Sequence, residues 1–324
     1  MPIAIQISKT GGPEVLRVAE VAVPQLGPGL ALVRHGAVGV NYIDTYHRSG
    51  LYPLPRMPHG IGVEAAGVVE ALGDGVGEVK VGDRVAYVGG APGAYAELCA
   101  VPADRLVPLP ASVSDEVAAA MMLKGMTVEY LVQRTFRVEA GMTVLWHAAA
   151  GGVGLIACQW LHKLGVTVIG TVGSDAKAEI ARAHGCDHTI VYTHEDIVAR
   201  VRELTGGRGV PVVYDSVGKS TFQPSLACLA PRGMLVGFGN ASGKPDPFDV
   251  LELSRRGSLY LTRPTLFDYV ATRAELLSSA QALFDRVAGG LRIEIGQRFA
   301  LREAVEAHRS LESRATTGST VLLP

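Results

Sequence analysis

The stretch Trp146-His147-Ala148-Ala149-Ala150-Gly151-Gly152-Val153-Gly154 decides the fold of this 324-residue chain. It continues the short apolar run Thr143–His147, which is typical of a buried strand, and leads into the apolar helical segment Leu155–Leu164. A glycine-rich turn between a strand and a helix is the pattern of a dinucleotide-binding domain. The sequence therefore predicts a phosphate-binding turn in the middle of the chain.

Three small residues occupy the places that such a turn requires. Ala149 holds the place of the tight turn, Gly151 that of the close approach of backbone to phosphate, and Gly154 that of tight helix–strand packing. The helix that begins near Gly152 then offers unpaired N–H groups and the positive end of its dipole to an anion. We expect a pyrophosphate to bind along Gly151, Gly152, Val153 and Gly154.

Strand-like and helix-like segments alternate from Thr143 to Leu261. The expected strands are Thr143–His147, Val166–Val172, Thr189–Val191, Val210–Asp215, Met234–Phe238 and Ser258–Leu261. Helix-like segments between them include Asp175–His184, His194–Thr205 and Thr221–Leu229. Strands joined by helical crossovers predict an α/β domain with a doubly wound parallel sheet.

The first third of the chain has a different texture. Short alternating runs separated by turns predict a β-rich, barrel-like domain, and they cover Ile3–Ile7, Val15–Val23, Leu30–Val38, Ala65–Leu72 and Arg84–Val88. Helix signals begin at Ser114 and continue through Met126–Phe136. The tail has amphipathic stretches and short β segments, at Arg273–Ala288, Leu301–Leu311, Ile293 and Val321. We expect residues 124–263 to form the nucleotide-binding domain, and residues 264–324 to complete a domain of residues 1–123.

The composition excludes several classes of partner. Lysine and arginine number 30 against 31 aspartates and glutamates, so charge gives no reason to expect nucleic acid or an anionic membrane. The longest uncharged apolar stretch, Ala148–Cys158, is too short to span a bilayer, and Met1–Ile7 alternates like a strand rather than a signal peptide. The four cysteines, Cys99, Cys158, Cys186 and Cys228, are scattered without the paired spacing of a metal site or disulfide framework. This pattern favours reduced thiols in the cytoplasm.

The end of the second expected strand identifies the nucleotide. An enzyme that uses NAD places an acid there, about 20 residues beyond the glycine turn, to bind the ribose hydroxyls. This chain has Gly173-Ser174 at that point, with Lys177 close behind. A hydroxyl and a cation suit a 2′-phosphate, and Tyr192 at the end of the third strand is placed to close the same pocket. Asp175 suits the first turn of a helix, so the pattern favours NADPH.

Longer motifs extend this interpretation to the whole chain: Gly11–Leu16, Asn41–Tyr46, Arg48–Pro53, Gly82–Val85, Val213–Gly218 and Glu312–Thr316. With these motifs and the glycine turn, the chain resembles from end to end the zinc-free NADPH:quinone oxidoreductases of the medium-chain dehydrogenase/reductase superfamily, a group that includes zeta-crystallin. The resemblance implies a GroES-like β-barrel domain, a Rossmann domain, an active-site cleft between them and a homodimer formed through the nucleotide-binding domains.

The resemblance also implies which residues contact NADPH. Tyr42, Ile43, Asp44, Thr45 and Tyr46 correspond to the segment under the nicotinamide, and Tyr130, Gly152 and Val153 to contacts of the pyrophosphate. It assigns Gly173, Ser174, Lys177 and Tyr192 to the 2′-phosphate, in agreement with the residues themselves. The remaining implied contacts are Ser216, Phe238, Gly239, Asn240, Ala241, Pro264, Thr265, Leu266 and Arg314.

Two positions indicate whether the chain binds a catalytic zinc ion. Zinc-dependent relatives place a cysteine where this chain has Asn41 and a histidine where it has Val63, and neither residue present here is a zinc ligand. Without zinc, a ketone would have to form an alkoxide of pKa about 15.7, whereas a quinone forms a phenolate-like anion of pKa about 10. A quinone needs mainly an apolar slot and hydrogen-bond donors, for which Asn41, Tyr46 and Tyr52 are the catalytic candidates.

Two alternatives remain open from the sequence. The same scaffold could reduce enones or other activated alkenes, a reaction that also requires a proton donor at the α-carbon. The chain could also bind NADPH without catalysis, in a structural or RNA-binding role. Arg255 and Arg256 form the local basic pair that an RNA-binding role would use. The net charge of −1 argues against the RNA-binding role.

Overall fold

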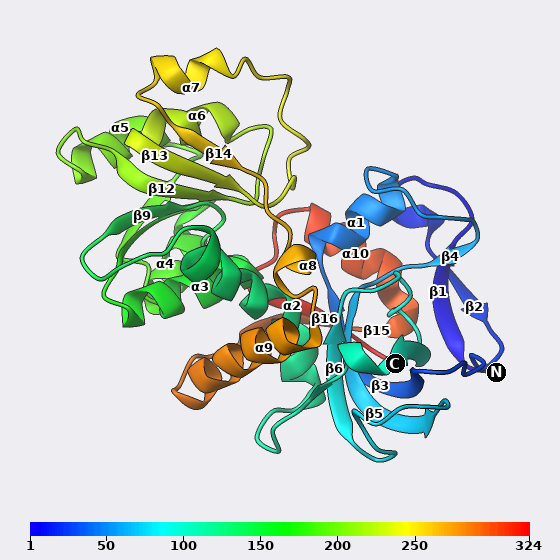
Figure 1. Cartoon of the computed structure of the whole chain (residues 1–324). Helices are drawn as coiled ribbons and strands as arrows, with labels where there is room; N and C mark the ends of the chain where they lie inside the picture. Colours follow the sequence, from blue (N-terminus) through cyan, green and yellow to red (C-terminus); the bar gives the residue numbers. More distant parts are fainter. The chain divides into compact units, whose positions relative to one another are not determined.

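The computed structural model describes the whole chain, from Met1 to Pro324. The chain separates into two compact units. In Figure 1 the colours follow the sequence from blue to red, so the β unit contains the blue and cyan segments and the red C-terminal segment. The β unit contains residues 1–126, 270–285 and 293–324, and the α/β unit contains residues 127–269 and 286–292. None of the helices combines the length and hydrophobicity that a membrane crossing requires.

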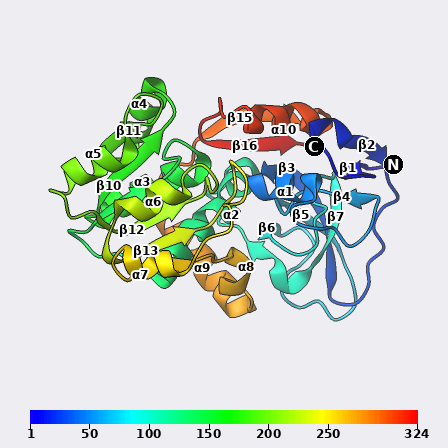
Figure 2. The same ribbon diagram turned by 90° about the horizontal axis from the view of Figure 1, so that it is seen from above.

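The strands of the β unit are β1 (Ile3–Ile7), β2 (Arg17–Glu20), β3 (Leu30–Val40), β4 (His59–Gly60), β5 (Glu64–Leu72), β6 (Arg84–Val88), β7 (Leu98–Pro102), β8 (Val107–Pro108), β15 (Ile295–Ala300) and β16 (Ser319–Leu323). Its helical segments are α1 (Tyr42–Ser49), most of α2 (Asp115–Tyr130), most of α9 (Arg273–Ala288) and α10 (Ala304–Glu312). One sheet has the order β2-β1-β4; the larger has the order β15-β16-β3-β5-β6-β8, with β7 also paired to β3. Figure 2 shows α10 lying along β15 and β16.

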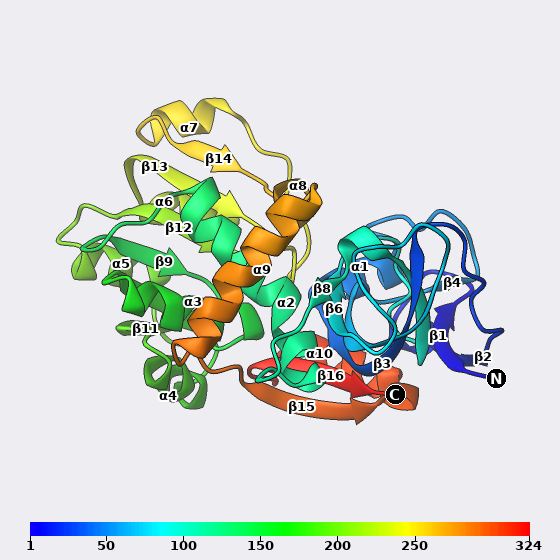
Figure 3. The same cartoon turned by 60° about the horizontal axis from the view of Figure 1, so that its bottom comes forward.

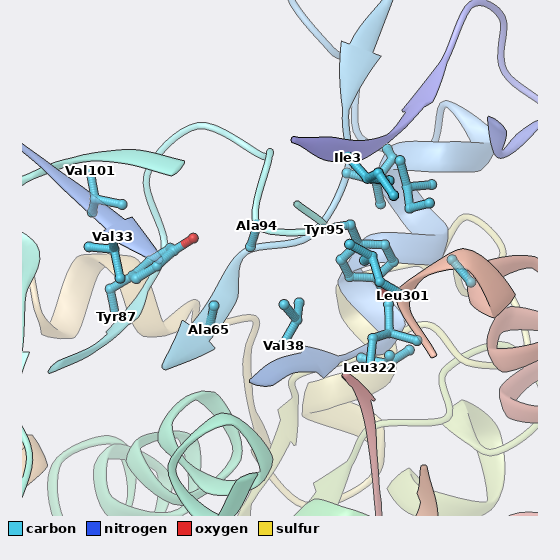
Figure 4. Packing of buried hydrophobic residues seen from close by; sticks show 14 of the residues in the cluster. Ile3, Val33, Val38, Ala65, Tyr87, Ala94, Tyr95, Val101, Leu301 and Leu322 are labelled. Atoms are coloured by element: carbon cyan, nitrogen blue, oxygen red, sulfur yellow. The ribbon is translucent and has the colours of Figure 1, made fainter. Parts of the chain in front are cut away.

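The core of the β unit lies where these sheets turn their apolar faces inward. The long strand β3 pairs with three neighbours and buries most of its side chains. Figure 4 shows part of this core, in which Val38, Tyr95 and Leu322 are completely buried. Because these residues come from the beginning and the end of the chain, burial of their apolar surface stabilises the C-terminal segment within this unit.

The strands of the α/β unit are β9 (Thr143–Trp146), β10 (Thr167–Val172), β11 (His188–Val191), β12 (Val210–Asp215), β13 (Leu229–Gly237) and β14 (Tyr260–Thr262). They form one parallel sheet of order β11-β10-β9-β12-β13-β14, so the predicted doubly wound sheet is confirmed. The helices are α3 (Gly152–Lys163), α4 (Asp175–Ala183), α5 (Ile197–Leu204), α6 (Phe222–Cys228), α7 (Leu251–Arg255) and α8 (Leu266–Tyr269).

Helices cover both faces of this sheet. In Figure 1, α3 and α4 pack together on one face, and α5 and α6 pack together on the other. The arrows of β12, β13 and β14 in Figure 3 point the same way, so the loops at their carboxyl ends share one edge. The order reverses between β9 and β12, and this reversal is where nucleotides bind in open α/β sheets.

Some boundaries differ from the sequence-based expectation for local reasons. The expected run Val15–Val23 is divided, because Pro13 begins a 3₁₀ turn that ends at Val15 and only Arg17–Glu20 forms a strand. The expected helix His194–Thr205 begins only at Ile197, because Asp196 caps it by accepting from the Ala199 N–H at 2.8 Å.

Two further boundaries moved by a few residues. The expected helical run Met126–Phe136 is not a single α-helix, because α2 ends at Tyr130 and a π-helical turn follows at Leu131–Thr135. Strand β13 begins at Leu229, five residues before the expected Met234, and contains an irregularity in its pairing with β12.

Candidate functional site

The glycine turn begins with a strained residue. Ala148 has a φ of 55°, in the left-handed region that non-glycine residues rarely adopt, so Ala148 and not Ala149 makes the tight turn. Ala149 is small for another reason. A Cβ atom on Gly170 of the neighbouring strand would lie only 2.6 Å from the Ala149 Cβ, so β9 and β10 leave no space for a larger residue.

Gly154 permits the close helix–strand packing that the sequence predicts. A Cβ atom on Gly154 would lie 2.4 Å from the Ala148 carbonyl oxygen and 2.6 Å from that of Ala149, so only glycine allows α3 to start so close to the turn. A Cβ atom on Gly151 would meet only the Ala148 carbonyl oxygen, at 3.3 Å. The position of a Cβ on Gly151 is therefore less crowded than that on Gly154, as the approach of a phosphate would require.

The first turn of α3 has the electrostatics of an anion site. Gly151 is the N-cap and supplies no side-chain acceptor, and the first turn contains no acidic residue. The first helical hydrogen bond runs from Leu155 N to Gly151 O at 2.9 Å. The N–H groups of Gly152, Val153 and Gly154 precede that bond, so a pyrophosphate fits this turn as an acceptor for them.

A buried network lies directly before this turn. His147 is fully buried, with Nδ1 2.9 Å from the Thr171 hydroxyl and Nε2 3.0 Å from the Ser225 hydroxyl. Ser225 and Thr221 both donate to the Asp215 carboxylate. Burial lowers the pKa of His147, so the ring is neutral. These bonds tie together the ends of β9, β10 and β12, and His147 is not placed as a proton donor to solvent.

The end of β10 has the predicted acid-free arrangement. A Cβ atom on Gly173 would lie 2.8 Å from the Tyr192 hydroxyl, so the tyrosine covers the glycine while remaining 46% exposed. Ser174 is the N-cap of α4 and accepts from the Lys177 N–H at 3.4 Å, which leaves its hydroxyl hydrogen able to donate. Burial lowers the pKa of Lys177, which indicates that its amine is partly shielded from water.

The Asp175 carboxylate is exposed to solvent. Its side chain is 85% exposed and faces the imidazole of His194 at 4.0 Å. This position in the first turn of α4 is the one that the sequence indicated. The Tyr192 hydroxyl lies beside Gly173, and Ser174 and Lys177 follow in the chain. A phenol, a hydroxyl and an amine are donors that fit a phosphate monoester better than a ribose diol.

The loops that follow β12 and β13 lie against each other. A Cβ atom on Gly239 would lie 2.4 Å from the Ser216 carbonyl oxygen, and the Ala241 N–H donates to that oxygen at 3.2 Å. The Phe238 ring lies 5.7 Å from the Trp146 ring under the sheet edge. Sequence-predicted residues Ser216, Phe238, Gly239, Asn240 and Ala241 are thus gathered at one end of the sheet.

Tyr130 and residues 264–266 are held by a separate contact. The Tyr130 ring stacks on Tyr269 at 4.4 Å, at the end of α8, and burial raises the pKa of Tyr130. The Arg263 guanidinium donates to the Pro264 carbonyl oxygen at 3.1 Å, and Leu266 is buried. The segment that contains Pro264, Thr265 and Leu266 follows β14. Its C-terminal end is held by the stacking of Tyr269 on Tyr130.

The β unit places the other predicted residues on α1. Asn41 is the N-cap, and its side-chain amide donates to the buried Glu64 carboxylate at 2.7 Å. The Asn41 N–H donates to Asp44 Oδ2 at 2.8 Å, which closes the first turn. Glu64 also accepts from the Leu123 N–H at 2.6 Å and lies 3.7 Å from the Lys124 amine, so the pKa-raising effect of its burial is partly opposed.

The side chains of α1 differ in solvent exposure and in their hydrogen-bond partners. Asp44 is completely buried, so it presents no carboxylate at the surface of α1, and the Thr45 hydroxyl donates to the Tyr42 carbonyl oxygen at 2.7 Å. The Tyr42 hydroxyl donates to the Leu311 carbonyl oxygen at 3.1 Å. That bond brings α1 to the end of α10, just before Arg314, whose φ of 58° marks a tight turn.

Tyr46 and Tyr52 form an aromatic pair. Their ring centres are 5.2 Å apart and the rings meet edge to face, while the Tyr52 N–H donates to the Tyr46 carbonyl oxygen at 3.0 Å. Tyr46 is buried and Tyr52 is half-buried. The structure therefore brings together two of the three residues proposed to contact a substrate, at the end of the helix that Asn41 begins.

The zinc-ligand positions of related enzymes contain no metal-binding set here. Val63 is apolar and completely buried, and Asn41 uses its amide nitrogen to bind Glu64. Nowhere in the chain do three histidine, cysteine, aspartate or glutamate side chains gather in a way that would hold a metal ion. The four cysteines are unpaired.

Sequence reasoning missed a second polar network around α1. Tyr95, His308, Arg48 and Glu312 form a hydrogen-bonded chain that reaches Asp44. Arg48 and Glu312 are separated by 264 residues, and no spacing rule signals such a pair. Their only trace in the sequence is that both belong to motifs of the family pattern.

The fold and the glycine turn define a two-domain oxidoreductase that binds a dinucleotide. The chain matches the family described as zinc-binding dehydrogenase over residues 152–277 and the alcohol dehydrogenase GroES-like domain over residues 27–111. It is 54% identical to the quinone oxidoreductase of Pseudomonas aeruginosa, over 99% of both chains. It is also 48% identical to the 2-haloacrylate reductase of a Burkholderia species, over 100% of this chain and 99% of the relative.

A solved structure agrees with this relationship. The quinone oxidoreductase of Escherichia coli complexed with NADPH superimposes with a TM-score of 0.98, at 47% identity, over 99% of this chain and 100% of that one. The chain belongs to the quinone oxidoreductase family of the medium-chain dehydrogenases/reductases.

Proposed function

We propose that this protein reduces quinones with NADPH and without zinc. The observation that carries the proposal is the acid-free end of β10, where Tyr192 covers Gly173 and where Ser174 and Lys177 follow. An acid at this position would favour NAD and repel a 2′-phosphate. A hydroxyl and a cation instead favour NADPH, the molecule bound in the similar Escherichia coli structure.

The proposed cofactor contacts come from several segments of the sequence. The N–H groups of Gly152, Val153 and Gly154 suit the pyrophosphate, and Ser174, Lys177 and Tyr192 suit the 2′-phosphate. The family correspondence adds Tyr42 to Tyr46, Tyr130, Ser216, Phe238 to Ala241, Pro264 to Leu266 and Arg314. When bound, NADPH supplies a hydride, and the protein's part is to orient the two reactants and exclude water.

Asn41, Tyr46 and Tyr52 would contact the quinone. The edge-to-face pair of Tyr46 and Tyr52 offers an aromatic surface with two hydroxyl groups, which suits a flat acceptor with carbonyl oxygens. The developing anion resembles a phenolate, of pKa about 10, so hydrogen bonds can stabilise it without a Lewis acid. A quinone reductase would therefore not need the zinc ligands whose positions are occupied here by Asn41 and Val63.

A second acceptor class is favoured by one comparison. A relative at 48% identity is named 2-haloacrylate reductase, and a haloacrylate is a conjugated alkene. Addition of hydride to such an alkene leaves an α-carbon that must receive a proton, and the hydroxyl groups of Tyr46 and Tyr52 are candidate donors. Tyr46→Phe and Tyr52→Phe would then reduce alkene turnover more than quinone turnover.

One steady-state experiment tests cofactor and acceptor together. NADPH and NADH are each assayed with a polycyclic ortho-quinone, with a haloacrylate and with a simple ketone. We expect quinone reduction with NADPH to dominate and the ketone to remain unreduced. Binding of NADPH without turnover of any quinone would refute the proposed reaction, and equal use of NADH would refute the assigned phosphate pocket.

We also propose a cytoplasmic homodimer formed through the α/β unit. The dimer is supported by the outer position of β14 in the sheet, where Tyr260 and Leu261 are 58% and 41% exposed. The cytoplasmic location is supported by the four free cysteines, which suit a reducing compartment. Light scattering of the purified protein would give the mass, and a monomer at all concentrations would contradict the dimer.

A further inference from the structure

A directed chain of hydrogen bonds ends on Asp44. Arg48 binds the Glu312 carboxylate through two bonds, of 2.7 and 2.9 Å, and donates to His308 Nδ1 at 2.9 Å. Since Nδ1 accepts, Nε2 carries the ring hydrogen and donates to the Tyr95 oxygen at 3.1 Å. The Tyr95 hydroxyl in turn donates to Asp44 Oδ2 at 2.9 Å. From Arg48 through His308 and Tyr95, the donors therefore point toward Asp44, while Arg48 is anchored on its other side by Glu312.

The histidine in this chain is held in one form. Burial and the neighbouring Arg48 guanidinium lower the pKa of His308 to about 3, so its ring is neutral throughout the physiological range. The tautomer is set by Arg48, which cannot accept a hydrogen bond. His308 therefore holds the Tyr95 oxygen from one side, and the tyrosine hydrogen can only serve the carboxylate.

Asp44 itself is a buried carboxylate with one free oxygen. Oδ2 accepts from Asn41 N at 2.8 Å as well as from Tyr95, whereas Oδ1 is buried and has no hydrogen-bond partner. The charged groups that face Asp44 come from other elements: Glu64 on β5 raises its pKa, and Lys124 on α2 lowers it. Burial is the largest effect and raises the pKa of Asp44 to about 7.

The two protonation states of Asp44 differ in how they hold α1. As a carboxylate, it accepts from both donors through Oδ2 and so closes the first turn on Asn41. As a neutral acid, it must place a hydrogen either on Oδ1, which faces no acceptor, or on Oδ2, which would displace a donor. The ionised form therefore holds the start of the helix more firmly.

We propose that Asp44 is a positioning residue for quinone reduction: its ionised carboxylate, held by Tyr95 and His308, keeps the first turn of α1 and with it Asn41 and Tyr46 in place. The proposal rests on the proposed function, because Asn41 and Tyr46 are the side chains assigned to the quinone. Asp44 is too deeply buried to contact the quinone through its carboxylate. Its influence passes through the Asn41 N–H and the backbone of α1.

The test compares Tyr95→Phe and Asp44→Asn with wild type. For each protein, kcat/KM for an ortho-quinone with saturating NADPH and the thermal midpoint are measured from pH 5 to pH 9. We expect wild-type activity to fall on the acid side with an apparent pKa near 7. Loss of one hydrogen bond to the carboxylate in Tyr95→Phe should move this limb up by about one pH unit. In Asp44→Asn the loss of activity on the acid side should disappear, and kcat/KM above pH 8 should be about tenfold lower than in wild type.

Tyr87→Phe is the matched control. Tyr87 is another buried tyrosine of the same core, and its hydroxyl lies 3.0 Å from His35 Nε2 and does not contact Asp44. This variant should lose stability as Tyr95→Phe does but keep the wild-type pH profile. The proposal is overturned if Tyr95→Phe and Asp44→Asn keep that profile, or if Tyr87→Phe shifts it equally.

The thermal midpoint separates this proposal from the proposed function. If wild type reduces no quinone, the proposed function fails and the positioning of a quinone fails with it. The pH dependence of the thermal midpoint would then show whether Asp44 ionises with a pKa near 7, because Asp44→Asn removes that dependence and Tyr87→Phe keeps it.

Discussion

His147 Nε2 lies 3.0 Å from the Ser225 hydroxyl, and this bond connects the glycine turn to helix α6. Ser225 donates its own hydrogen to the Asp215 carboxylate at 2.9 Å, so its oxygen must accept from His147. It is therefore not a nucleophile activated by a histidine. The pair holds the sheet edge on which Ala148 adopts its left-handed conformation.

Ser225→Ala tests this link. The variant leaves the His147 N–H without an acceptor and removes one donor to Asp215, so we expect a loss of about 1–3 kcal/mol of stability. Because the glycine turn loses support, KM for NADPH should rise about tenfold while kcat changes little. Ser319→Ala is the control, since Ser319 is a buried serine of the β unit whose hydroxyl donates to Ala120 O at 2.9 Å. It should lose similar stability at an unchanged KM.

Gly154→Ala tests the close approach of α3 to the turn. The new Cβ would meet two backbone carbonyl oxygens at 2.4 and 2.6 Å, and backbone cannot give way as a flexible side chain can. We expect NADPH to bind more than about tenfold more weakly in a fluorescence titration. Gly77→Ala, whose Cβ would meet no atom within 4 Å, should bind NADPH normally. Equal affinity of the two variants would contradict the role given to Gly154.

Lys177→Ala tests the choice of nucleotide. Removal of a cation from a phosphate monoester costs about 1.5–3 kcal/mol, so KM for NADPH should rise by about 10- to 100-fold while KM for NADH stays the same. Lys80→Ala removes an exposed lysine from the β unit and should change neither value. A parallel loss for NADPH and NADH would mean that Lys177 supports the fold of α4 rather than the 2′-phosphate.

His35→Gln tests a buried neutral histidine against pH. Burial lowers the pKa of His35 from 6.5 to about 4, so between these values the unfolded chain binds a proton that the folded chain does not. His35 therefore contributes its full stability above pH 6.5, and this contribution of about 3 kcal/mol is lost as pH falls toward 4. Urea unfolding of His35→Gln should show a shallower loss in this range. His188→Gln, at an exposed position, should keep the wild-type slope.

Asp44 works in the opposite direction over part of the same range. Its pKa is raised from 3.8 to about 7, so the folded chain binds a proton that the unfolded chain does not. Its contribution to stability is fully present below pH 3.8 and is lost as pH rises through 7. Asp44→Asn should therefore be more stable than wild type above pH 7 and should lose this advantage in acid, as unfolding curves at pH 5 and pH 8.5 would show.

The sequence by itself determined the elements with strong local signals. Gly151 and Gly154, the alternation of strands with helices, and the absence of an acid at Gly173 each follow from side-chain size or charge within a few residues. It did not show that Ala148 rather than Ala149 takes the positive φ, nor that Ala149 packs against Gly170 of the neighbouring strand, because both depend on how the strands and the turn pack.

Only the tertiary structure decided which polar groups meet in the interior. Asn41 binds Glu64 across 23 residues, His147 binds Ser225 across 78, and Arg48 binds Glu312 across 264. No local pattern encodes such pairs, because a buried polar group needs a partner wherever the packed sheets place one. The sequence thus predicted where phosphates bind, and long-range packing specified what holds the neighbouring side chains in place.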